Sequence, residues 1–179
     1  MTSKIALFVG PSGSGKTTIA NYLIDNFGLS QIDSYTTRPR RYPGEPGHTY
    51  ITDEEFDRLT DMVAYTDFDG KRYCATTQQV EENDIYVVDV AGVEYFKEHY
   101  HGSKAVYVFY FLANAQELQQ RMILRGDGGL DIARRIQNDA IMFENAEERL
   151  KALYPNTHLI QNDNIEKTAQ EILKILKEE

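Results

Sequence analysis

A short segment near the start of the chain has the residue types and the spacing that bind phosphate groups. Residues 10–17 read Gly-Pro-Ser-Gly-Ser-Gly-Lys-Thr and match the pattern G-x-x-x-x-G-K-[ST] at every fixed position. In such a phosphate loop, glycines let the backbone curl closely, so that successive N–H groups point at phosphate oxygens. Lys16 would reach the outer phosphates of ATP in a catalytic role, and the Thr17 hydroxyl would bind Mg²⁺. The predicted ATP-binding residues here are Gly10, Pro11, Ser12, Gly13, Ser14, Gly15, Lys16, Thr17 and Thr18.

The segments on both sides of the phosphate loop are of the kinds that this motif requires. Ile5–Val9 is an apolar run that predicts a buried strand, and Thr17–Phe27 carries apolar residues at helical spacing. A helix that begins at the loop directs its positive N-terminal end at the phosphates. An acid at the end of a neighbouring strand is also expected, and Asp89 directly follows the apolar run Ile85–Val88. We predict that Asp89 holds the Mg²⁺ through water while Thr17 binds it directly.

Further apolar runs alternate with amphipathic stretches along the rest of the chain. Ala105–Phe111 predicts a third buried strand, and weaker runs at 158–160 and 31–33 predict two more. Apolar residues at helical spacing predict further helices in three stretches, namely 115–124, 131–153 and 165–176. Strands that alternate with helices predict a parallel sheet covered on both faces. The predicted fold class is therefore α/β, a three-layer α/β/α fold of the P-loop NTPase type with a parallel sheet.

Two segments interrupt this alternation. Residues 35–80 combine prolines, glycines and many tyrosines, which predicts a small irregular or antiparallel insertion. Residues 126–133 begin with Gly-Asp-Gly-Gly, which predicts a flexible lid. We expect one domain over residues 1–179, in which residues 1–34 and 81–179 form the core around these two segments.

Composition and charge narrow the partners. The 179 residues carry a net charge of −9, which argues against a nucleic-acid-binding protein because such proteins present a basic face. No apolar run reaches the roughly 18 residues of a membrane helix, and the N-terminus lacks the pattern of a signal peptide. The only cysteine, Cys74, cannot form an internal disulfide, and it is expected to be a packed residue. We expect a cytoplasmic protein without nucleic-acid or membrane partners.

The arginines of this acidic chain are unevenly spread. An acidic protein that clusters arginine is expected to hold discrete anions such as phosphates, because guanidinium groups match the geometry of phosphate oxygens. The two groups are Arg38, Arg40, Arg41 and Arg72, and then Arg121, Arg125, Arg134 and Arg135. The two groups are therefore expected to hold phosphate groups.

Several longer segments resemble those of the guanylate kinase family and occur in that family's order. Residues 34–45 are similar to S-x-T-T-R-x-x-R-x-G-E with one residue inserted. The other matching segments are 47–56 (G-x-x-Y…(S/D)-x-(D/E)-E-F), 68–73 (F-x-G-x-x-Y), 89–92 (D-x-Q-G), 121–136 (R-L-x-x-R-G…I-x-x-R-L) and 161–163 (V-N-D). The resemblance implies an ATP- and Mg²⁺-dependent kinase that phosphorylates a nucleoside monophosphate, with GMP or dGMP as the leading acceptor.

The resemblance also implies roles for residues on the acceptor side. Arg38 and Arg41 would grip the acceptor phosphate with forked donors, and the inserted residue makes Arg40 a competitor for the role of Arg41. Tyr50 and Tyr73 would add hydroxyl donors. The remaining implied acceptor contacts are Ser34 and Asp89. The insertion would therefore be the acceptor-binding part of the molecule.

Other implied residues act on ATP and on the phosphoryl group in transit. Arg125 and Arg135 would spread the charge of that group as catalytic residues together with Arg38, and Arg121 is a further candidate. Asn162 would meet the adenine of ATP. No protein nucleophile is needed, because the acceptor phosphate is already anionic.

One part of the family pattern is missing. Where guanylate kinases carry a Glu that pairs with the guanine edge, this chain has Ala64, and the second base contact is Ala75. Two lost hydrogen bonds to a carboxylate remove about 3–6 kcal/mol of guanine preference, unless Asp67 or Asp69 replaces them. A different nucleoside monophosphate, or a sugar phosphate such as ribose bisphosphate, stays open as the acceptor. A non-catalytic guanylate-kinase-like module and a stand-alone NTP hydrolase are less favoured alternatives.

Overall fold

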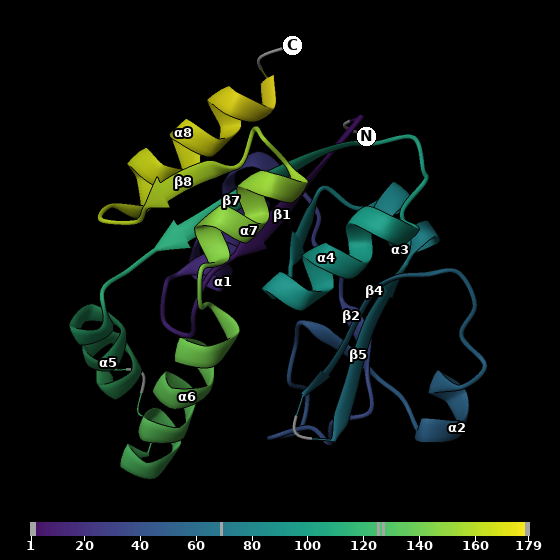
Figure 1. Cartoon of the computed structure of the whole chain (residues 1–179), viewed down its shortest axis with the longest axis horizontal. Coiled ribbons are helices and arrows are strands. Elements are labelled where there is room, and N and C mark those ends of the chain that lie inside the picture. The colour runs from purple at the N-terminus through teal and green to yellow at the C-terminus, as the bar shows by residue number, and fades with distance from the viewer. Residues whose placement is uncertain (1–2, 69, 125, 127, 178–179) are drawn as a thin grey trace.

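Figure 1 shows the computed structural model, which describes residues 3–68, 70–124, 126 and 128–177. The strands form two sheets of four strands each. In the view of Figure 1, one sheet lies in the upper part of the molecule, and strands β4 and β5 of the other lie in the lower right part. Among the described residues, no helix has the length and apolar character needed to cross a membrane.

The first sheet is parallel throughout, and its strands run in the order β6-β1-β7-β8. Strand β1 pairs with β6 and with β7, and its Ala6 lies opposite Ile85 of β6 and Tyr107 of β7. The expected strand at 31–33 is wrong, because only Gln31 forms a bridge, to Ile85 at the edge of the sheet. The strand bounds are Lys4–Val9 for β1, Ile85–Val87 for β6, Ala105–Leu112 for β7 and His158–Gln161 for β8.

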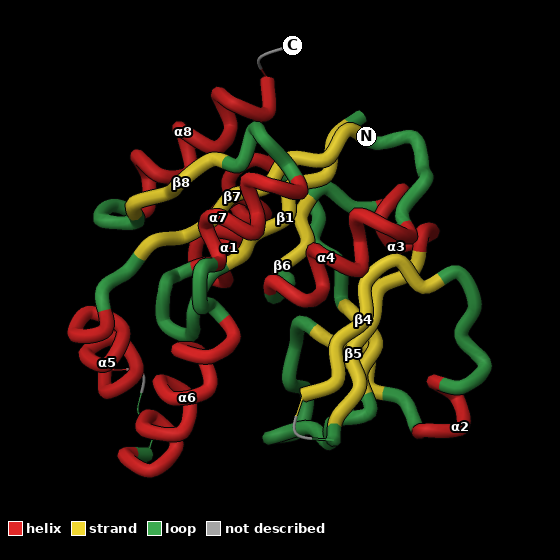
Figure 2. The backbone as a smooth tube through the Cα atoms, in the orientation of Figure 1, coloured by secondary structure: helices red, strands yellow, loops and turns green. Residues whose placement is uncertain are grey.

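Strand β1 is apolar from Ile5 to Val9 because the sheet is covered on both faces. Successive side chains of a strand point to opposite faces. Leu7 packs in the cluster that includes Val93 of α4 and Leu150 of α7, whereas Phe8 packs in the cluster that includes Leu23 of α1 and Ile172 of α8. Figure 2 shows these helices as red tubes around the yellow strands. The predicted three-layer α/β/α arrangement is confirmed, with helices α1 (Lys16–Phe27), α4 (Val90–His99), α7 (Ala146–Leu153) and α8 (Ile165–Lys177).

The prediction of one helix over 131–153 is wrong, because the chain turns between two helices. Helix α6 covers Gly129–Met142 and α7 begins at Ala146, after Asn145 takes a left-handed conformation with φ 52°. The turn brings Phe143 onto the core, where its ring stacks on Tyr110 with centroids 6.3 Å apart. Helix α7 can therefore cover the sheet while α6 packs beside α5 (Ala115–Leu124), away from it (Figure 1).

The second sheet lies within the segment for which an irregular or antiparallel insertion is predicted. Its order is β3-β2-β5-β4, and β5 pairs antiparallel with both β2 and β4, whereas β2 and β3 are parallel. Helix α4 packs against β4 and so connects the two sheets. The bounds are Ser34–Thr36 for β2, His48–Tyr50 for β3, Met62–Phe68 for β4 and Lys71–Thr76 for β5. The short helices nearby are α2 (Asp53–Phe56) and α3 (Thr77–Glu82).

The carboxyl ends of the parallel strands define where a ligand site is expected. In open α/β sheets, ligands bind just outside the carboxyl ends of the strands. Strand β1 ends at Val9 and leads into residues 10–15, and β7 ends at Leu112 shortly before α5. Strand β8 ends at Gln161, directly before Asn162. The chain thus brings the phosphate loop, α5 and Asn162 together at the carboxyl ends of the parallel strands.

Candidate active site

The phosphate loop has a backbone that only glycines adopt easily. Gly13 and Gly15 have φ angles of 83° and 95°, in the left-handed region where a side chain is strained. A Cβ atom on Gly10 would lie 2.8 Å from the backbone oxygen of Phe111, and one on Gly15 would overlap the side-chain amide of Asn162. The glycines therefore allow the loop to lie closely against both β7 and the residue after β8.

The ammonium group of Lys16 lies against this loop. Its Nζ donates hydrogen bonds to the carbonyl oxygens of Gly10 at 2.6 Å and Pro11 at 2.9 Å. Thr17 and Thr18 are exposed in the first turn of α1, directly after the loop. Predicted phosphate and metal contacts thus converge at the N-terminal end of α1, where the helix dipole also favours anions.

Asn162 and Arg121 hold the loop from the side of the parallel sheet. The side-chain amide of Asn162, which is 9% exposed, donates to the carbonyl oxygen of Ser14 at 3.2 Å. Arg121 of α5 donates to the backbone oxygen of Asn162 at 3.1 Å and, more weakly, to the oxygens of Gly13 and Ser14 at 3.4 Å each. Both residues lie at the predicted ATP site, and both contact the loop itself.

Helix α6 contributes a carboxylate that the sequence pattern alone does not single out. Asp139 accepts a hydrogen bond from the backbone N–H of Ser12 at 2.7 Å, across 127 positions of the chain. The signal in the sequence is its spacing from Arg135, because residues four apart share one face of a helix. Arg135 is half-buried on the same helix, whereas the predicted Arg125 lies outside the described residues.

Asp89 connects the two sheets. Its Oδ1 accepts hydrogen bonds from the N–H of Gly92 at 2.7 Å, as the N-cap of α4, and from the hydroxyl of Thr66 on β4 at 2.9 Å. Burial raises the pKa of the Asp89 carboxyl above its usual value, although both hydrogen bonds oppose that rise. The described hydrogen bonds end on Oδ1, so the other oxygen is the one placed to accept from a water or a ligand.

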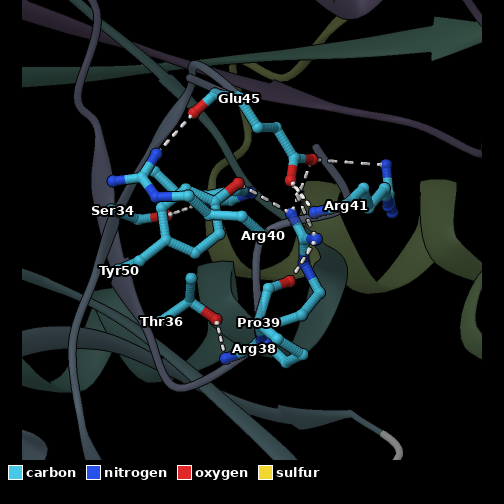
Figure 3. A network of polar contacts seen from close by, with 9 residues as sticks. Ser34, Thr36, Arg38, Pro39, Arg40, Arg41, Glu45 and Tyr50 are labelled. Carbon is cyan, nitrogen blue, oxygen red and sulfur yellow. Dashed lines mark hydrogen bonds and ion pairs between the residues drawn. The ribbon is translucent and has the colours of Figure 1, made fainter. Parts of the chain in front are cut away.

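On the second sheet, the predicted acceptor residues gather around an acid (Figure 3). Arg38 forms a bidentate pair with the Glu45 carboxylate, with N–O distances of 2.9 and 3.2 Å. Arg38 also donates to the hydroxyl of Tyr50 at 3.1 Å. The same carboxylate accepts the backbone N–H of Arg41 at 2.7 Å. Glu45 thereby fixes the direction of the Arg38 guanidinium and the path of the loop that follows it.

Like Asp139, Glu45 is a site residue for which no role is predicted from the sequence, although it is the final glutamate of the family-like segment 34–45. The carboxylate is 7% exposed, and the hydrogen bond from Arg38 lowers its pKa to about 2. It is therefore ionised at neutral pH, when both carboxylate oxygens can accept hydrogen bonds. The signal in the sequence is a lone acid that closely follows three arginines.

The structure also separates the two arginines that compete for the second phosphate contact. The guanidinium of Arg40 lies 4.1 Å from the ring centroid of Tyr50 and donates to the backbone oxygen of Glu45 at 3.0 Å. The Arg41 side chain is 59% exposed, with its nearest contact to the Glu45 carboxylate at 3.7 Å. Both arginines are exposed, but Arg40 is held over the Tyr50 ring, whereas the Arg41 side chain lies at the rim of the cluster.

Next to this cluster, Ser34 pairs with a histidine on the adjacent strand. Ser34 Oγ lies 2.9 Å from His48 Nδ1, and the two residues are register partners in β2 and β3. The His48 ring makes edge contacts with the rings of Tyr50 and Tyr73, with centroids 5.9 and 5.7 Å apart. Burial lowers the pKa of His48, and the charge of Arg38 lowers it further. The ring is therefore mostly neutral at pH 7, and Ser34, Tyr50 and Tyr73 are drawn together around it.

Ala64 and Ala75 lie opposite each other in the β4–β5 ladder and are 1% and 0% exposed. Both pack in the core cluster on the α4 side of the parallel sheet, so no open space surrounds them in this structure.

The neighbouring Cys74 is also fully buried, and burial raises the pKa of its thiol to about 12. Cys74 is thus a packed thiol, as expected. Asp67 is exposed on β4, and Asp69 lies outside the described residues.

The donor set for a magnesium ion suits the way this metal is held by proteins. Within the described ranges, no three acidic, histidine or cysteine side chains gather as a cage for a metal ion. Magnesium usually keeps several waters and takes one or two protein ligands together with substrate phosphates. The exposed Thr17 hydroxyl and the anchored Asp89 carboxylate fit that pattern.

Similarity to known proteins agrees with this geometry. The sequence model described as "Guanylate kinase" matches residues 2–179. The guanylate kinase of Bacteroides thetaiotaomicron is 31% identical over an alignment of 191 residues, gaps included, which covers 99% of this chain and 90% of that protein. The guanylate kinase of Helicobacter pylori is 28% identical over 186 residues, spanning 97% of this chain and 86% of that protein.

A solved structure supports the same fold. The crystal structure of guanylate kinase from Anaplasma phagocytophilum superposes with a TM-score of 0.66 and covers 97% of this chain and 84% of that chain. The identity is 22%, so this likeness concerns the fold alone. The family's sequence model, by contrast, spans almost the whole chain. The chain belongs to the guanylate kinase family.

Proposed function

We propose that this protein transfers the γ-phosphoryl group of ATP to GMP or dGMP and releases ADP and the nucleoside diphosphate. The observation that supports the proposal is that one molecule carries two separate clusters of cationic donors, each a candidate anion site. One is the phosphate loop with Lys16, and the other is the Arg38 cluster on the second sheet. A kinase of a phosphorylated acceptor needs both sites, because donor and acceptor each bring phosphate groups to the reaction.

On the donor side, the loop N–H groups and Lys16 bind the phosphates of ATP, and the α1 N-terminus adds its dipole. Mg²⁺ would be held by the Thr17 hydroxyl, with Asp89 acting through a water, and would neutralise charge on the phosphates. Asn162, whose side-chain amide donates to the carbonyl oxygen of Ser14, would also meet the adenine. Arg121 reaches this side from α5, and Arg125 and Arg135 are proposed to act with it on the phosphoryl group in transit.

On the acceptor side, Arg38 presents its guanidinium in the direction that Glu45 sets, and the hydroxyls of Tyr50 and Tyr73 complete the phosphate grip. Arg41, at the rim of the cluster, is free to swing onto an incoming phosphate, whereas Arg40 supports Tyr50. Ser34 and Asp89 would contact the nucleoside.

The reaction requires no nucleophile from the protein. An oxygen of the acceptor phosphate attacks the γ-phosphorus in line, and the bond to ADP breaks on the opposite side. The protein contributes position and positive charge. We propose that the segment at 35–80 and the lid at 126–133 close around the substrates, because exclusion of water suppresses hydrolysis of ATP.

A second candidate acceptor follows from the base-reading positions. Ala64 and Ala75 carry no hydrogen-bonding side chain, and both are buried. An acceptor without guanine, such as another nucleoside monophosphate or a ribose bisphosphate, would lose no hydrogen bond at these two positions. The phosphate grip would serve it equally well.

The deciding experiment mixes the protein with Mg-ATP and one acceptor at a time and measures ADP formation. The panel contains GMP, dGMP, AMP, CMP, UMP, dTMP and ribose 1,5-bisphosphate. A clear preference for GMP or dGMP supports the proposal. Preference for another acceptor supports the second candidate. Equal ADP release with and without acceptor would identify a hydrolase, and tight Mg-ATP binding without any turnover would identify a binding module.

A further inference from the structure

The contact between Asp139 and the phosphate loop places a carboxylate where a phosphate is expected. The Ser12 N–H belongs to the row of loop donors that the motif directs at phosphate oxygens. In the structure this donor is taken by Asp139 Oδ2 at 2.7 Å. A carboxylate oxygen and a phosphate oxygen are both anionic acceptors, so they compete for the same N–H.

The surroundings of this contact are those of an anion site. Lys16 Nζ hydrogen-bonds to the carbonyl oxygens of Gly10 and Pro11, the two residues that precede Ser12. The α1 helix begins at Lys16 and directs its N-terminal end at the loop. A negative charge here is favourable before nucleotide binds. It becomes unfavourable next to a triphosphate, because like charges repel strongly at short range.

The contact also fixes a helix that packs mainly on α5. Helix α6 has one fully buried residue, Ile132, and it is separated from the core helix α7 by the turn at Asn145. The Asp139 contact, by contrast, ties the second half of α6 directly to residues 10–15. Releasing Asp139 therefore frees one of the connections that hold α6 against the nucleotide site.

We propose that Asp139 acts as an internal substitute for a nucleotide phosphate, which occupies the Ser12 N–H until ATP displaces it. The inference rests on the proposed function only in that ATP binds at the phosphate loop. Because ATP must displace the Asp139 carboxylate, its binding free energy is reduced by the strength of the contact. The same displacement couples nucleotide binding to the position of α6, which also carries Arg135. Asp139 is thus a positioning residue that tunes nucleotide affinity.

The test compares nucleotide binding by the wild type with that of Asp139→Asn and Asp139→Ala, without any acceptor. A fluorescent ATP analogue and calorimetry give the Kd for ATP and ADP, with and without Mg²⁺. A hydrogen bond to a charged group corresponds to roughly 10–100-fold in an equilibrium constant. We expect Asp139→Ala to bind ATP about tenfold more tightly, and Asp139→Asn to show a smaller gain because its amide oxygen still accepts the N–H.

A thermodynamic cycle separates this role from a merely structural one. If the contact exists only before nucleotide binds, Asp139→Ala lowers the Tm of the free protein but leaves the Tm at saturating ATP unchanged, because coupling is reciprocal. Glu144→Gln, which removes an exposed charge just beyond α6, should change neither Kd nor Tm. Comparison of ATP with ADP shows whether the γ-phosphate is the competitor.

Several results would overturn the proposal. Unchanged or weaker ATP binding by both Asp139 variants would mean that the carboxylate does not compete with phosphate. Weaker binding only when Mg²⁺ is present would make Asp139 a metal-site residue instead. Failure of the wild type to bind ATP would refute both this inference and the proposed function, whereas normal wild-type binding with unaltered variants would refute the inference alone.

Discussion

Glu45 holds the Arg38 guanidinium by two hydrogen bonds of 2.9 and 3.2 Å, and the same carboxylate accepts the backbone N–H of Arg41. One buried acid thus orients the forked donors that face the acceptor and shapes the loop around them. Removal of Glu45 is expected to weaken acceptor binding far more than ATP binding, because the phosphate loop follows a strand of the other sheet.

Arg38→Ala is predicted to abolish most activity and also to destabilise the protein. It leaves the Glu45 carboxylate, 7% exposed, without its main partner, which costs about 3 kcal/mol in the free energy of unfolding. The double variant Arg38→Ala/Glu45→Gln should recover much of that stability but none of the activity. Urea unfolding and steady-state kinetics measure the two effects. Equal activity of the folded double variant and the wild type would rule out Arg38 as the phosphate grip.

The ionisation of Glu45 predicts a loss of stability in acid. Arg38 lowers the pKa of Glu45 in the folded protein to about 2, whereas an unfolded glutamate has a pKa of about 4.3. The folded state therefore favours the ionised form, and the stabilisation is fully present above pH ~4.3 and is lost as the pH falls through about 2. The difference in unfolding free energy between wild type and Glu45→Gln should shrink over that window. A difference that stays constant would show that Glu45 keeps an ordinary pKa.

Lys16→Ala is predicted to lower kcat by on the order of 10²–10³, since it removes a donor that stabilises charge in the transition state. Its hydrogen bonds to Gly10 and Pro11 lie at the loop surface and not in the core, so the Tm should change by only a few degrees. Kinetics at saturating GMP together with thermal unfolding check this expectation. A fully active variant would show that the loop does not hold the donor phosphates in the expected way.

His48 predicts a second pH dependence, at milder pH. Burial and the nearby Arg38 lower the pKa of His48, so the unfolded chain takes up a proton that the folded protein resists. Stability should therefore fall as the pH decreases from about 7 through the unfolded histidine pKa of about 6.5. His48→Gln should flatten this slope. His158, whose pKa burial also lowers, is present in both proteins and cancels in the comparison. Identical slopes for the two proteins would contradict the assignment.

Ala64→Glu tests whether the position across from Ala75 faces the base. The free variant should have a lower Tm than the wild type, because a carboxylate would enter a site that is 1% exposed. If guanine binds beside it, GMP should raise the Tm of this variant more than AMP does, and activity on GMP should increase relative to AMP. Equal shifts with GMP and AMP would place the base elsewhere in the site.

Sequence and structure agree best where the chemistry is local. The phosphate loop can be predicted because its glycines, Lys16 and Thr17 are contiguous, and because a strand and a helix must flank it. The single helix expected over 131–153 is wrong, since Phe143 is drawn onto the core and Asn145 takes a left-handed turn that apolar spacing does not reveal. The Asp139 contact is not predictable either, because it depends on how α6 packs in three dimensions.

The acceptor cluster shows the same limit. Its arginines could be found by type, but only the packing distinguishes Arg40, which lies on Tyr50, from Arg41, which is 59% exposed. Ala64 illustrates the converse case. Its side chain has no polar group, so the sequence indicates a missing contact without indicating that the position is closed by core packing.

The hydrogen bond from the Asn162 side chain to the Ser14 carbonyl oxygen has a consequence for the synthesis of this protein. Ser14 leaves the ribosome 148 positions before Asn162, whose side-chain amide holds it, and α8, which packs against the helix that begins at the loop, follows later still. Chains are made at about 5–20 residues per second. Over the 148 positions between Ser14 and Asn162, this rate gives an interval of about 7–30 seconds, during which the nascent chain carries a nucleotide-binding motif without its supporting hydrogen bond.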